Sequence, residues 1–126
     1  MNSETKRKIL VIDDAVTVRM YHKQAIESLG FSVEEADNGI EALEKALQNS
    51  YDLFLVDVNM PKMDGYALVK EMRKNEELSA VPVIMISTEA ELQDKDKAYE
   101  VGANYYIVKP AKEGTLQKIV GLLMGD

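Results

Sequence analysis

Residues 53–65 read LFLVDVNMPKMDG, and this stretch decides the fold. Its first four residues, 53–56, are continuously apolar, which is typical of a strand that is covered on both faces. The apolar run ends at Asp57, and the proline and glycine that follow are typical of a loop. The stretch therefore predicts an inner strand of a parallel sheet, with a carboxylate at the carboxyl end of that strand.

Four more strand-like segments occur along the chain, and segments with helical spacing separate them. The predicted strands are residues 9–12, 31–36, 81–86 and 105–108. Asn38 and Gly39 open the second of five predicted helices, while Gly30 and Gly102 close the first and the fourth. The residues expected to face inward are Val18, Tyr21, His22, Ala25, Ile26, Leu29, Ala42, Leu43, Ala46, Leu47, Tyr66, Leu68, Val69, Met72, Ala98, Val101, Leu116, Ile119, Val120, Leu122 and Leu123. Five strand–helix units predict an α/β fold, a doubly wound five-stranded parallel sheet with five helices on its two faces.

The length of 126 residues fits a single domain, residues 1–126, which begins with a polar tail at residues 1–7. The chain has no cysteine, which excludes disulfides and thiolate metal sites, and its one histidine excludes a multi-histidine site. That residue, His22, lies on the apolar stripe of the first predicted helix and is expected to be packed and partly buried. No apolar run approaches the roughly 18 residues of a membrane span, and the N-terminus does not resemble a secretory signal. We therefore expect a soluble, cytoplasmic monomer that does not bind membranes.

The charge balance is acidic, with 15 basic and 22 acidic side chains and a net charge of -7. A general nucleic-acid surface would be basic, so direct binding of nucleic acid is not expected. The simplest role of the excess negative charge is solubility.

Polar side chains follow four of the predicted strands at the point where each strand ends. Asp13 and Asp14 follow the first strand and Asp57 the third, while Ser87 follows the fourth and Lys109 the fifth. In a parallel sheet these positions lie at one edge, where open α/β sheets bind ligands. We therefore expect three carboxylates, a hydroxyl and an amine in one crevice.

The expected crevice favours a particular metal. Three neighbouring carboxylates repel each other, so a purely structural role for all three is disfavoured, although Asp14 could cap the first helix. Oxygen ligands without histidine or cysteine suit Mg²⁺, for which Mn²⁺ can substitute. Mg²⁺ prefers one or two carboxylates together with phosphate oxygens. The sequence therefore predicts a magnesium site that also handles a phosphoryl group.

Four sequence features, in this order, resemble the receiver domains of response regulators. They are DD after the first predicted strand, D-x-N-M-P-x-M-D-G from Asp57, serine after the fourth strand and K-P after the fifth. The resemblance spans residues 8–123 and points to the single-domain regulators of chemotaxis. It implies a flavodoxin-like sheet with the strand order 2-1-3-4-5. It also implies a two-component signalling protein that is not an enzyme beyond catalysing its own phosphoryl transfer and dephosphorylation.

The resemblance implies roles for the carboxylates. Asp57 matches the residue that accepts a phosphoryl group from a histidine kinase in a Mg²⁺-dependent reaction. Asp14 and Asp57 match direct metal ligands, and Asn59 matches a ligand through its backbone carbonyl. Asp13 matches a ligand that acts largely through water.

The resemblance also implies which residues hold the phosphoryl group and respond to it. Ser87 and Lys109 match the groups that hold phosphoryl oxygens, and Asn59 and Glu89 occupy positions that tune the lifetime of the phosphoryl group. Tyr106 matches an aromatic residue that changes rotamer on activation. Phosphorylation is expected to draw Ser87 inward and so free space for the Tyr106 ring.

Signal output is expected at the face formed by the fourth helix, the fifth strand and the fifth helix. Leu92 and Tyr99 share a stripe of the fourth helix, and we expect them to be partly exposed beside Tyr106 and Val108. Such a face fits a downstream target, for example a flagellar motor switch protein or a phosphatase.

One departure from the family lies next to the site. Lys109-Pro110 matches a peptide bond that is cis in the family. The following residue, Ala111, stands where many members carry an aromatic residue. We expect Ala111 to lie near the output surface, so this departure concerns the partner and not the chemistry.

Other functions are weaker matches to the sequence. The chain could be a receiver domain taken from a larger regulator, or a shuttle that passes the phosphoryl group onward. An aspartyl phosphatase would carry D-x-D after the first strand, whereas Asp13 and Asp14 are adjacent. A flavin-binding module would carry a loop rich in Ser, Thr and Gly there, and two acids would repel a flavin phosphate.

Overall fold

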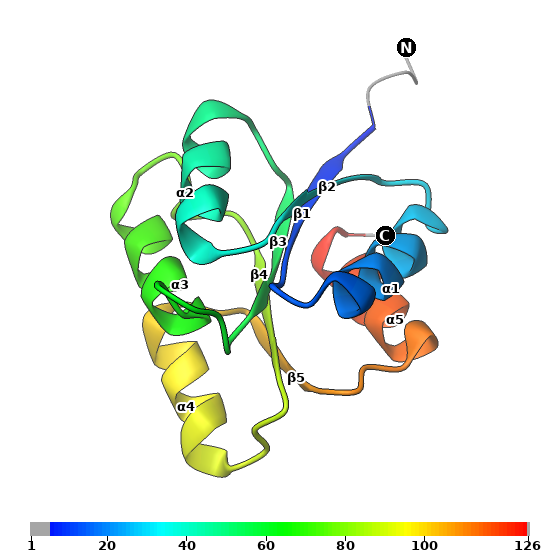
Figure 1. The fold of residues 1–126 in the computed structure, drawn as a ribbon. Coiled ribbons are helices and arrows are strands. Elements are labelled where there is room, and N and C mark those ends of the chain that lie inside the picture. The colour runs from blue at the N-terminus through cyan, green and yellow to red at the C-terminus, as the bar shows by residue number, and fades with distance from the viewer. Residues whose placement is uncertain (1–5, 126) are drawn as a thin grey trace.

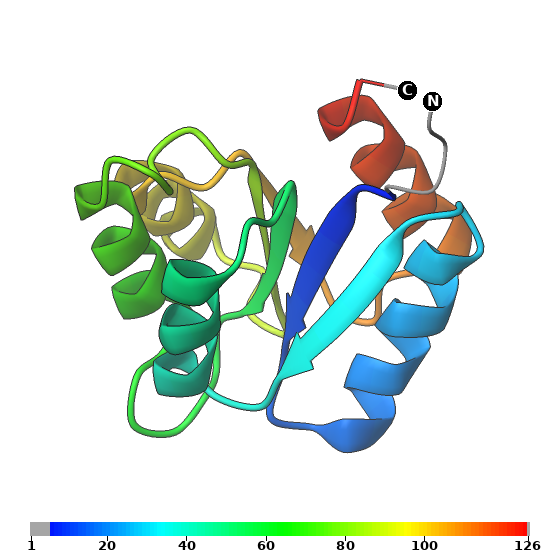
Figure 2. The same ribbon diagram turned by 90° about the horizontal axis from the view of Figure 1, so that it is seen from above.

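The computed structural model describes residues 6–125, which form one parallel sheet in the order β2-β1-β3-β4-β5. The strands are β1 (Lys8–Ile12), β2 (Ser32–Ala36), β3 (Leu53–Asp57), β4 (Val83–Ser87) and β5 (Tyr105–Val108). The helices are α1 (Val16–Glu27), α2 (Gly39–Gln48), α3 (Gly65–Lys74), α4 (Leu92–Val101) and α5 (Glu113–Leu123). Helices α2, α3 and α4 cover one side of the sheet, and α1 and α5 cover the other (Figure 1), as the view from above also shows (Figure 2). The predicted doubly wound α/β fold and its strand order are therefore confirmed.

The ends of the strands differ slightly from the prediction. β5 has the predicted bounds, whereas β4 begins at Val83, because Pro82 has no N–H to donate to a neighbouring strand. β3 continues through Asp57, which pairs with Ile86 of β4. The backbone of Asp57 is thus part of the sheet, and this restricts the position of its carboxylate.

Alternation along the strands divides the apolar core into two layers. Phe54 and Met85 pack with Met72 on the side of α2, α3 and α4. Leu55 and Ile84 pack with Leu116 on the side of α1 and α5. The strand ends that carry the predicted site therefore project from a sheet that is packed on both faces.

Four residues that were expected to face inward are exposed, and for these the prediction was wrong. The exposed fractions are 45% for Tyr21, 41% for Leu29, 54% for Leu47 and 66% for Leu122. Leu29 lies beyond the end of α1, and Leu47 and Leu122 lie in the last turns of their helices. Helical spacing marks a stripe along a whole helix, but a helix packs on the sheet over only part of its length and width.

Helix α4 is anchored at its C-terminal end. It ends at Gly102, whose φ of 113° favours glycine, and an added Cβ would lie 2.7 Å from Cγ of Arg73. Nε and Nη2 of Arg73 donate to the Gly102 carbonyl at 3.0 and 2.9 Å, and Nη2 also donates to Oδ1 of Asn104. At the other end, Glu91 provides no side-chain cap. The two ends of α4 are therefore held by different contacts, the C-terminal end by Arg73 and the first turn by the Tyr66 hydroxyl, which donates to the Asp94 carbonyl at 3.1 Å.

Most of the predicted N-terminal tail, residues 1–5, lies outside the described residues. Arg7 is held against the domain, because its Nη1 donates to the carbonyl of Met124 at 2.6 Å and its guanidinium lies 5.1 Å from the ring centroid of Phe31. Within residues 6–125, no helix combines the length and the apolar character that crossing a membrane requires.

Candidate functional site

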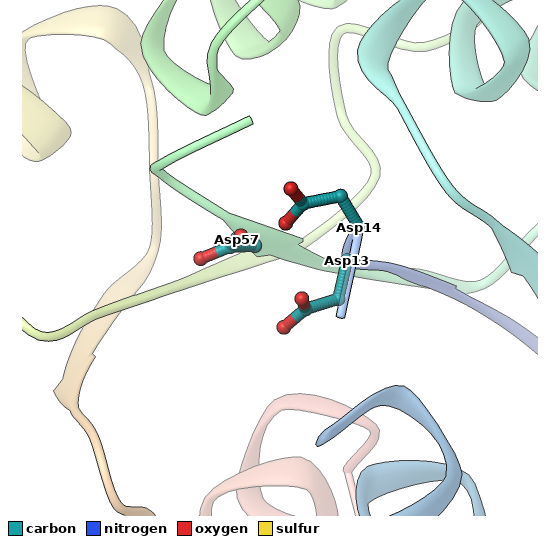
Figure 3. A group of neighbouring side chains, drawn as sticks. All are labelled: Asp13, Asp14 and Asp57. Atoms are coloured by element: carbon teal, nitrogen blue, oxygen red, sulfur yellow. The ribbon is translucent and has the colours of Figure 1, made fainter. Parts of the chain in front are cut away.

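Three carboxylates meet at the carboxyl ends of β1 and β3. Oxygen atoms of Asp13, Asp14 and Asp57 lie within 4.8 Å of one another (Figure 3). Asp13 and Asp57 are buried, and Asp14 is exposed. The three side chains come together because β1 and β3 are hydrogen-bonded neighbours in the sheet. The predicted convergence of these carboxylates at one edge is therefore seen in the structure.

The turn after β1 leaves Asp14 free of a structural role as a helix cap. The N-cap of α1 is Ala15, which makes no side-chain cap, so the alternative role considered for Asp14 is absent. Asp13 stabilises the turn instead, because its Oδ1 accepts a hydrogen bond from the Ala15 N–H at 2.9 Å. Nη1 of Arg19 donates to the Asp13 carbonyl at 2.6 Å. Sequence reasoning did not identify this support by Arg19.

The amine at the end of β5 lies between two of the carboxylates. Nζ of Lys109 is 3.1 Å from Oδ2 of Asp13 and 3.0 Å from Oδ1 of Asp57. The Lys109 N–H donates to the Ser87 carbonyl at 2.7 Å, and the Lys109-Pro110 peptide bond is cis, as the family resemblance implies. The ammonium group therefore neutralises part of the negative charge of the cluster.

The charges of the cluster change the acidity of its members. The pKa of the Asp57 carboxyl is raised to about 6, mainly by burial and also by the nearby charge of Asp13, while the hydrogen bond and charge of Lys109 oppose the change. Burial disfavours the charged form of Lys109, but hydrogen bonds and charge from Asp57 and Asp13 outweigh it and raise its pKa. At neutral pH the lysine is therefore protonated and Asp57 is mostly ionised.

The loop after β3 packs closely against the backbone of Asp57. The Gly65 N–H donates to the Val58 carbonyl at 2.9 Å, and a Cβ added to Gly65 would lie 2.5 Å from the Asp57 carbonyl oxygen. Oδ1 of Asp64 accepts a hydrogen bond from the Ala67 N–H at 2.8 Å and caps α3. The D-G pair of the motif thus has a physical role that sequence reasoning left unexplained, although this pair is a common turn signal.

Ser87 and Tyr106 belong to a chain of hydrogen bonds beside the cluster. The Ser87 hydroxyl donates to Oδ1 of Asn59 at 3.1 Å and accepts from the Glu89 N–H at 3.0 Å. The Tyr106 hydroxyl donates to the Glu89 carbonyl at 2.8 Å, and the residue is only 6% exposed. The Tyr106 ring is therefore already buried while Ser87 is bonded to Asn59. The sequence-based expectation was that the ring moves inward only after phosphorylation has drawn Ser87 toward Asp57.

The residues predicted for signal output divide into two groups. Leu92 and Tyr99 are 73% and 46% exposed, as expected for a contact surface. Tyr106 is buried, and Val108 is partly buried against the core, so neither forms an open part of that surface. The apolar surface on this side is therefore carried mainly by α4.

The expectation that Ala111 lies near the output surface was wrong. Ala111 is buried and, with Pro110, faces Val18 and Tyr21 of α1 across a cavity on the other side of the sheet. The segment that follows leads into α5, which packs beside α1 (Figure 2). The small side chain at position 111 therefore affects the α1 side and not α4.

A five-stranded parallel sheet in this order, with three carboxylates and a lysine at its carboxyl edge, defines an α/β signalling domain of the receiver type. The sequence matches the family model of the response regulator receiver domain over residues 9–121. This chain therefore belongs to the response regulator receiver domain family and is CheY-like.

Two relatives and one solved structure illustrate the similarity. The chain is 41% identical to chemotaxis protein CheY-3 of Vibrio cholerae over 112 residues, which cover 88% of the chain and 86% of that protein. It is 39% identical to the gliding motility regulatory protein of Myxococcus xanthus over 102 residues, 81% of the chain, but spans only 13% of that protein's length. The receiver domain of sensor histidine kinase PA1611 from Pseudomonas aeruginosa PAO1, with a magnesium ion coordinated in its active-site cleft, superposes with a TM-score of 0.89. Its sequence is 30% identical, and the match covers 97% of this chain and 100% of that chain.

The donor set of the site fits a divalent cation. Receiver domains bind Mg²⁺ at an acidic pocket, and the group of Asp13, Asp14 and Asp57 offers only oxygen ligands, which are the ligands that Mg²⁺ prefers. Receiver domains are signalling proteins and not enzymes in the ordinary sense. Membership of this family therefore indicates that the acidic group belongs to a signalling protein.

Proposed function

We propose that this chain is a two-component response regulator whose Asp57 accepts a phosphoryl group from the phosphohistidine of a histidine kinase. The observation that carries the proposal is a buried carboxylate at a strand end with an ammonium group at 3.0 Å and two further carboxylates within 4.8 Å. A carboxylate is a weak nucleophile, but it suffices against a good phosphoryl donor.

The proposed reaction uses the side chains as follows. An oxygen of Asp57 attacks phosphorus, the P–N bond of the donor breaks, and the donor imidazole leaves with its electron pair. The transition state spreads negative charge over three phosphoryl oxygens. The Lys109 ammonium stabilises one of these oxygens, and the Ser87 hydroxyl donates to another after it leaves Asn59.

Asp13, Asp14, Asp57 and the backbone carbonyl of Asn59 are the groups that would hold Mg²⁺, with Mn²⁺ as a substitute. When bound, the metal supplies positive charge that offsets the phosphoryl oxygens beside an acidic cluster. Asn59 and Glu89 are exposed at the rim of the site. We therefore expect their side chains to affect how easily water reaches the acyl phosphate, and hence how long the phosphoryl group survives.

The output proposed for this switch is a change in binding to a protein target in chemotaxis or motility, such as a flagellar motor switch protein or a phosphatase. The similarity to a chemotaxis protein and to a gliding motility regulator supports this pathway. The exposed Leu92 and Tyr99 support a contact surface on α4. Onward phosphotransfer, or work as the receiver part of a larger regulator, is the second candidate because one relative is far longer than this chain.

The test is intact mass spectrometry after incubation with acetyl phosphate, with and without Mg²⁺. Wild type with Mg²⁺ should gain one phosphoryl group, whereas Asp57→Asn, and wild type with a chelator, should gain none. Asp96→Asn, which changes an exposed carboxylate on α4, is the matched control and should be labelled like wild type. Equal labelling of Asp57→Asn would overturn the proposed acceptor.

Removal of the metal gives a second readout that does not need phosphorylation. Mg²⁺ should raise the melting temperature of wild type, because a ligand that binds only the folded state stabilises it by mass action. The increase should be smaller in Asp13→Ala and smallest in Asp14→Ala, the proposed direct ligand. A melting curve that saturating Mg²⁺ leaves unchanged in wild type would show that the metal site is wrong.

A further inference from the structure

The peptide group between Asp13 and Asp14 is held by a side chain of α1. Nη1 of Arg19 donates to the Asp13 carbonyl at 2.6 Å. On the other side of the same residue, the Asp13 N–H donates to the Ala36 carbonyl of β2 at 3.1 Å. A hydrogen bond from a charged donor is roughly twice as strong as one between neutral groups. Arg19 therefore restricts the orientation of the peptide group that links the two acidic residues.

The orientation of this peptide group determines how the two carboxylates are presented. A peptide group is planar, so the Asp13 carbonyl and the Cα of Asp14 lie in one plane. The two side chains leave the end of β1 in different directions, and one oxygen of each still lies within 4.8 Å of the other and of Asp57 (Figure 3). Lys109 contacts the Asp13 carboxylate, whereas the Asp14 carboxylate accepts no hydrogen bond from residues 6–125. The position of Asp14 therefore depends on its backbone and not on a partner among these residues.

Glu35 of β2 holds the guanidinium in place. Nε of Arg19 lies 2.9 Å from Oε1 of Glu35, and the Arg19 side chain is only 14% exposed. The hydrogen bond from Arg19 lowers the pKa of the Glu35 carboxyl, with a further contribution from Lys23, so Glu35 is ionised at neutral pH. The rigid fork of an arginine can donate to two acceptors at once. Arg19 therefore links β2 to the turn that carries Asp13 and Asp14.

Lys23 binds the same carboxylate and provides an internal comparison. Its Nζ lies 3.2 Å from Oε2 of Glu35. Within residues 6–125, Arg19 donates to the Asp13 carbonyl and Lys23 does not. Either cation repels a divalent cation at the neighbouring carboxylates, so charge alone predicts tighter Mg²⁺ binding when Arg19 or Lys23 is removed. An effect of the hydrogen bond to Asp13 has the opposite sign.

We propose that Arg19 is a positioning residue for the metal site and holds the peptide group between Asp13 and Asp14 so that both carboxylates are available to one ion. This role rests on the proposed Mg²⁺ site and adds to it a residue that does not touch the ion. Groups that orient metal ligands commonly contribute roughly tenfold or more to metal affinity. The hydrogen bond therefore outweighs the repulsion between the guanidinium and the ion, and removal of Arg19 weakens Mg²⁺ binding.

The test is a titration of the full chain with Mg²⁺, followed through the NMR amide signals of Asp14 and Asn59. Arg19→Met, which removes the charge and the donors but keeps an apolar stem, should weaken Mg²⁺ binding about tenfold. Lys23→Met, the matched control, should bind Mg²⁺ as tightly as wild type or slightly more tightly. Because both variants lose one positive charge beside the same carboxylate, opposite directions isolate the hydrogen bond to Asp13.

Arg19→Lys separates the charge from the geometry. It keeps one positive charge but has no rigid fork with which to reach Glu35 and the Asp13 carbonyl together. Its affinity for Mg²⁺ should therefore lie between those of wild type and Arg19→Met. If Arg19→Met does not fold, Arg19→Lys should still bind Mg²⁺ more weakly than Lys23→Met.

The titration is made on folded protein, so a loss of stability does not by itself change the measured affinity. Urea unfolding with a chelator identifies the conditions in which each variant is folded. Equal or tighter Mg²⁺ binding by Arg19→Met would overturn the positioning role, and so would an equal weakening in Arg19→Met and Lys23→Met. Absence of Mg²⁺ binding by wild type would instead overturn the proposed metal site, on which this role depends.

Discussion

The two sides of the sheet reach the same carboxylate cluster but treat their buried polar groups differently. On the side of α2, α3 and α4, the Tyr106 hydroxyl donates to the Glu89 carbonyl and the Tyr66 hydroxyl donates to the Asp94 carbonyl. On the side of α1 and α5, Nδ1 of His22 has no partner within the described residues, and a cavity opens beside it. Connected polar groups fix one arrangement of side chains. The comparison teaches that the polar groups on the first side are joined by hydrogen bonds, whereas the second side leaves a buried nitrogen without a partner among the described residues.

The largest expected effect comes from a methyl group added on the tightly packed side. Gly65→Ala would place a Cβ 2.5 Å from the Asp57 carbonyl oxygen, so the backbone has to shift, and we expect a loss of about 3 kcal/mol of unfolding free energy. Gly121→Ala in α5 is the matched control, because an added Cβ meets nothing within 4 Å. That control should be neutral or gain up to about 1 kcal/mol from helix propensity. Urea unfolding measures the unfolding free energy of both variants. Equal values would show that the backbone around Gly65 is not packed more tightly than the surface of α5 around Gly121.

The second prediction uses the opposite pH dependence of two buried groups. The folded-state pKa of Asp57 lies above its ordinary value, at about 6, so its ionisation should cost the metal-free protein on the order of 2 kcal/mol as pH rises from about 4 to 6. The folded-state pKa of His22 lies below its ordinary value, so its contribution to stability should be lost as pH falls through that range. Urea unfolding of wild type, Asp57→Asn and His22→Leu between pH 4 and 7, with a chelator present, separates the two slopes. A wild-type curve parallel to that of Asp57→Asn would contradict the raised pKa.

A smaller effect is expected when one polar group is removed from each side. Tyr106→Phe deletes the hydroxyl that donates to Glu89 and should cost about 1 kcal/mol. His22→Leu deletes no side-chain hydrogen bond seen in residues 6–125 and should be close to neutral at pH 7. Thermal or urea unfolding of both variants tests the pair. If His22→Leu costs as much as Tyr106→Phe, the imidazole is better satisfied than the structure indicates.

The smallest effect on stability is expected at the exposed surfaces. Tyr99→Ala on α4 should change the unfolding free energy by less than about 0.5 kcal/mol and leave labelling by acetyl phosphate intact. If α4 carries the output contact, the same change should cost roughly 1 kcal/mol or more of binding to the partner. Leu122→Ala, which removes an exposed side chain of α5, should change neither quantity. Calorimetry measures the affinity of each variant for the partner. If Tyr99→Ala and Leu122→Ala bind the partner equally well, the output contact does not involve Tyr99.

The fold was largely predictable because its signals are local. Continuous apolar runs and helical spacing located every strand and helix, and β5 was predicted with its observed bounds. Asn38 was correctly predicted to open α2, where its Oδ1 accepts from the Glu41 N–H. The prediction was wrong for Leu47 and Leu122, since spacing along a helix does not tell how far the sheet extends beneath it.

The site was predictable in its composition and less so in its contacts. Asp13, Asp14, Asp57 and Lys109 follow strands, so the parallel topology alone brings them to one edge. The bond from Ser87 to Asn59 and the burial of the Tyr106 ring depend on side-chain rotamers, which sequence spacing does not encode. The position of Ala111 was also missed, because it depends on how the segment between β5 and α5 packs on the side of α1.

The anchoring of α4 has a mechanical consequence. With Gly102 held by Arg73, the helix has a pivot at one end, while its other end, at Leu92, has no side-chain cap. Ten helical residues make a lever arm of about 15 Å, so a tilt of about 4° at the pivot displaces Leu92 by about 1 Å. A tilt of α4 about this pivot would therefore move Leu92 furthest, and Leu92 is the most exposed large apolar side chain in the described part of the chain.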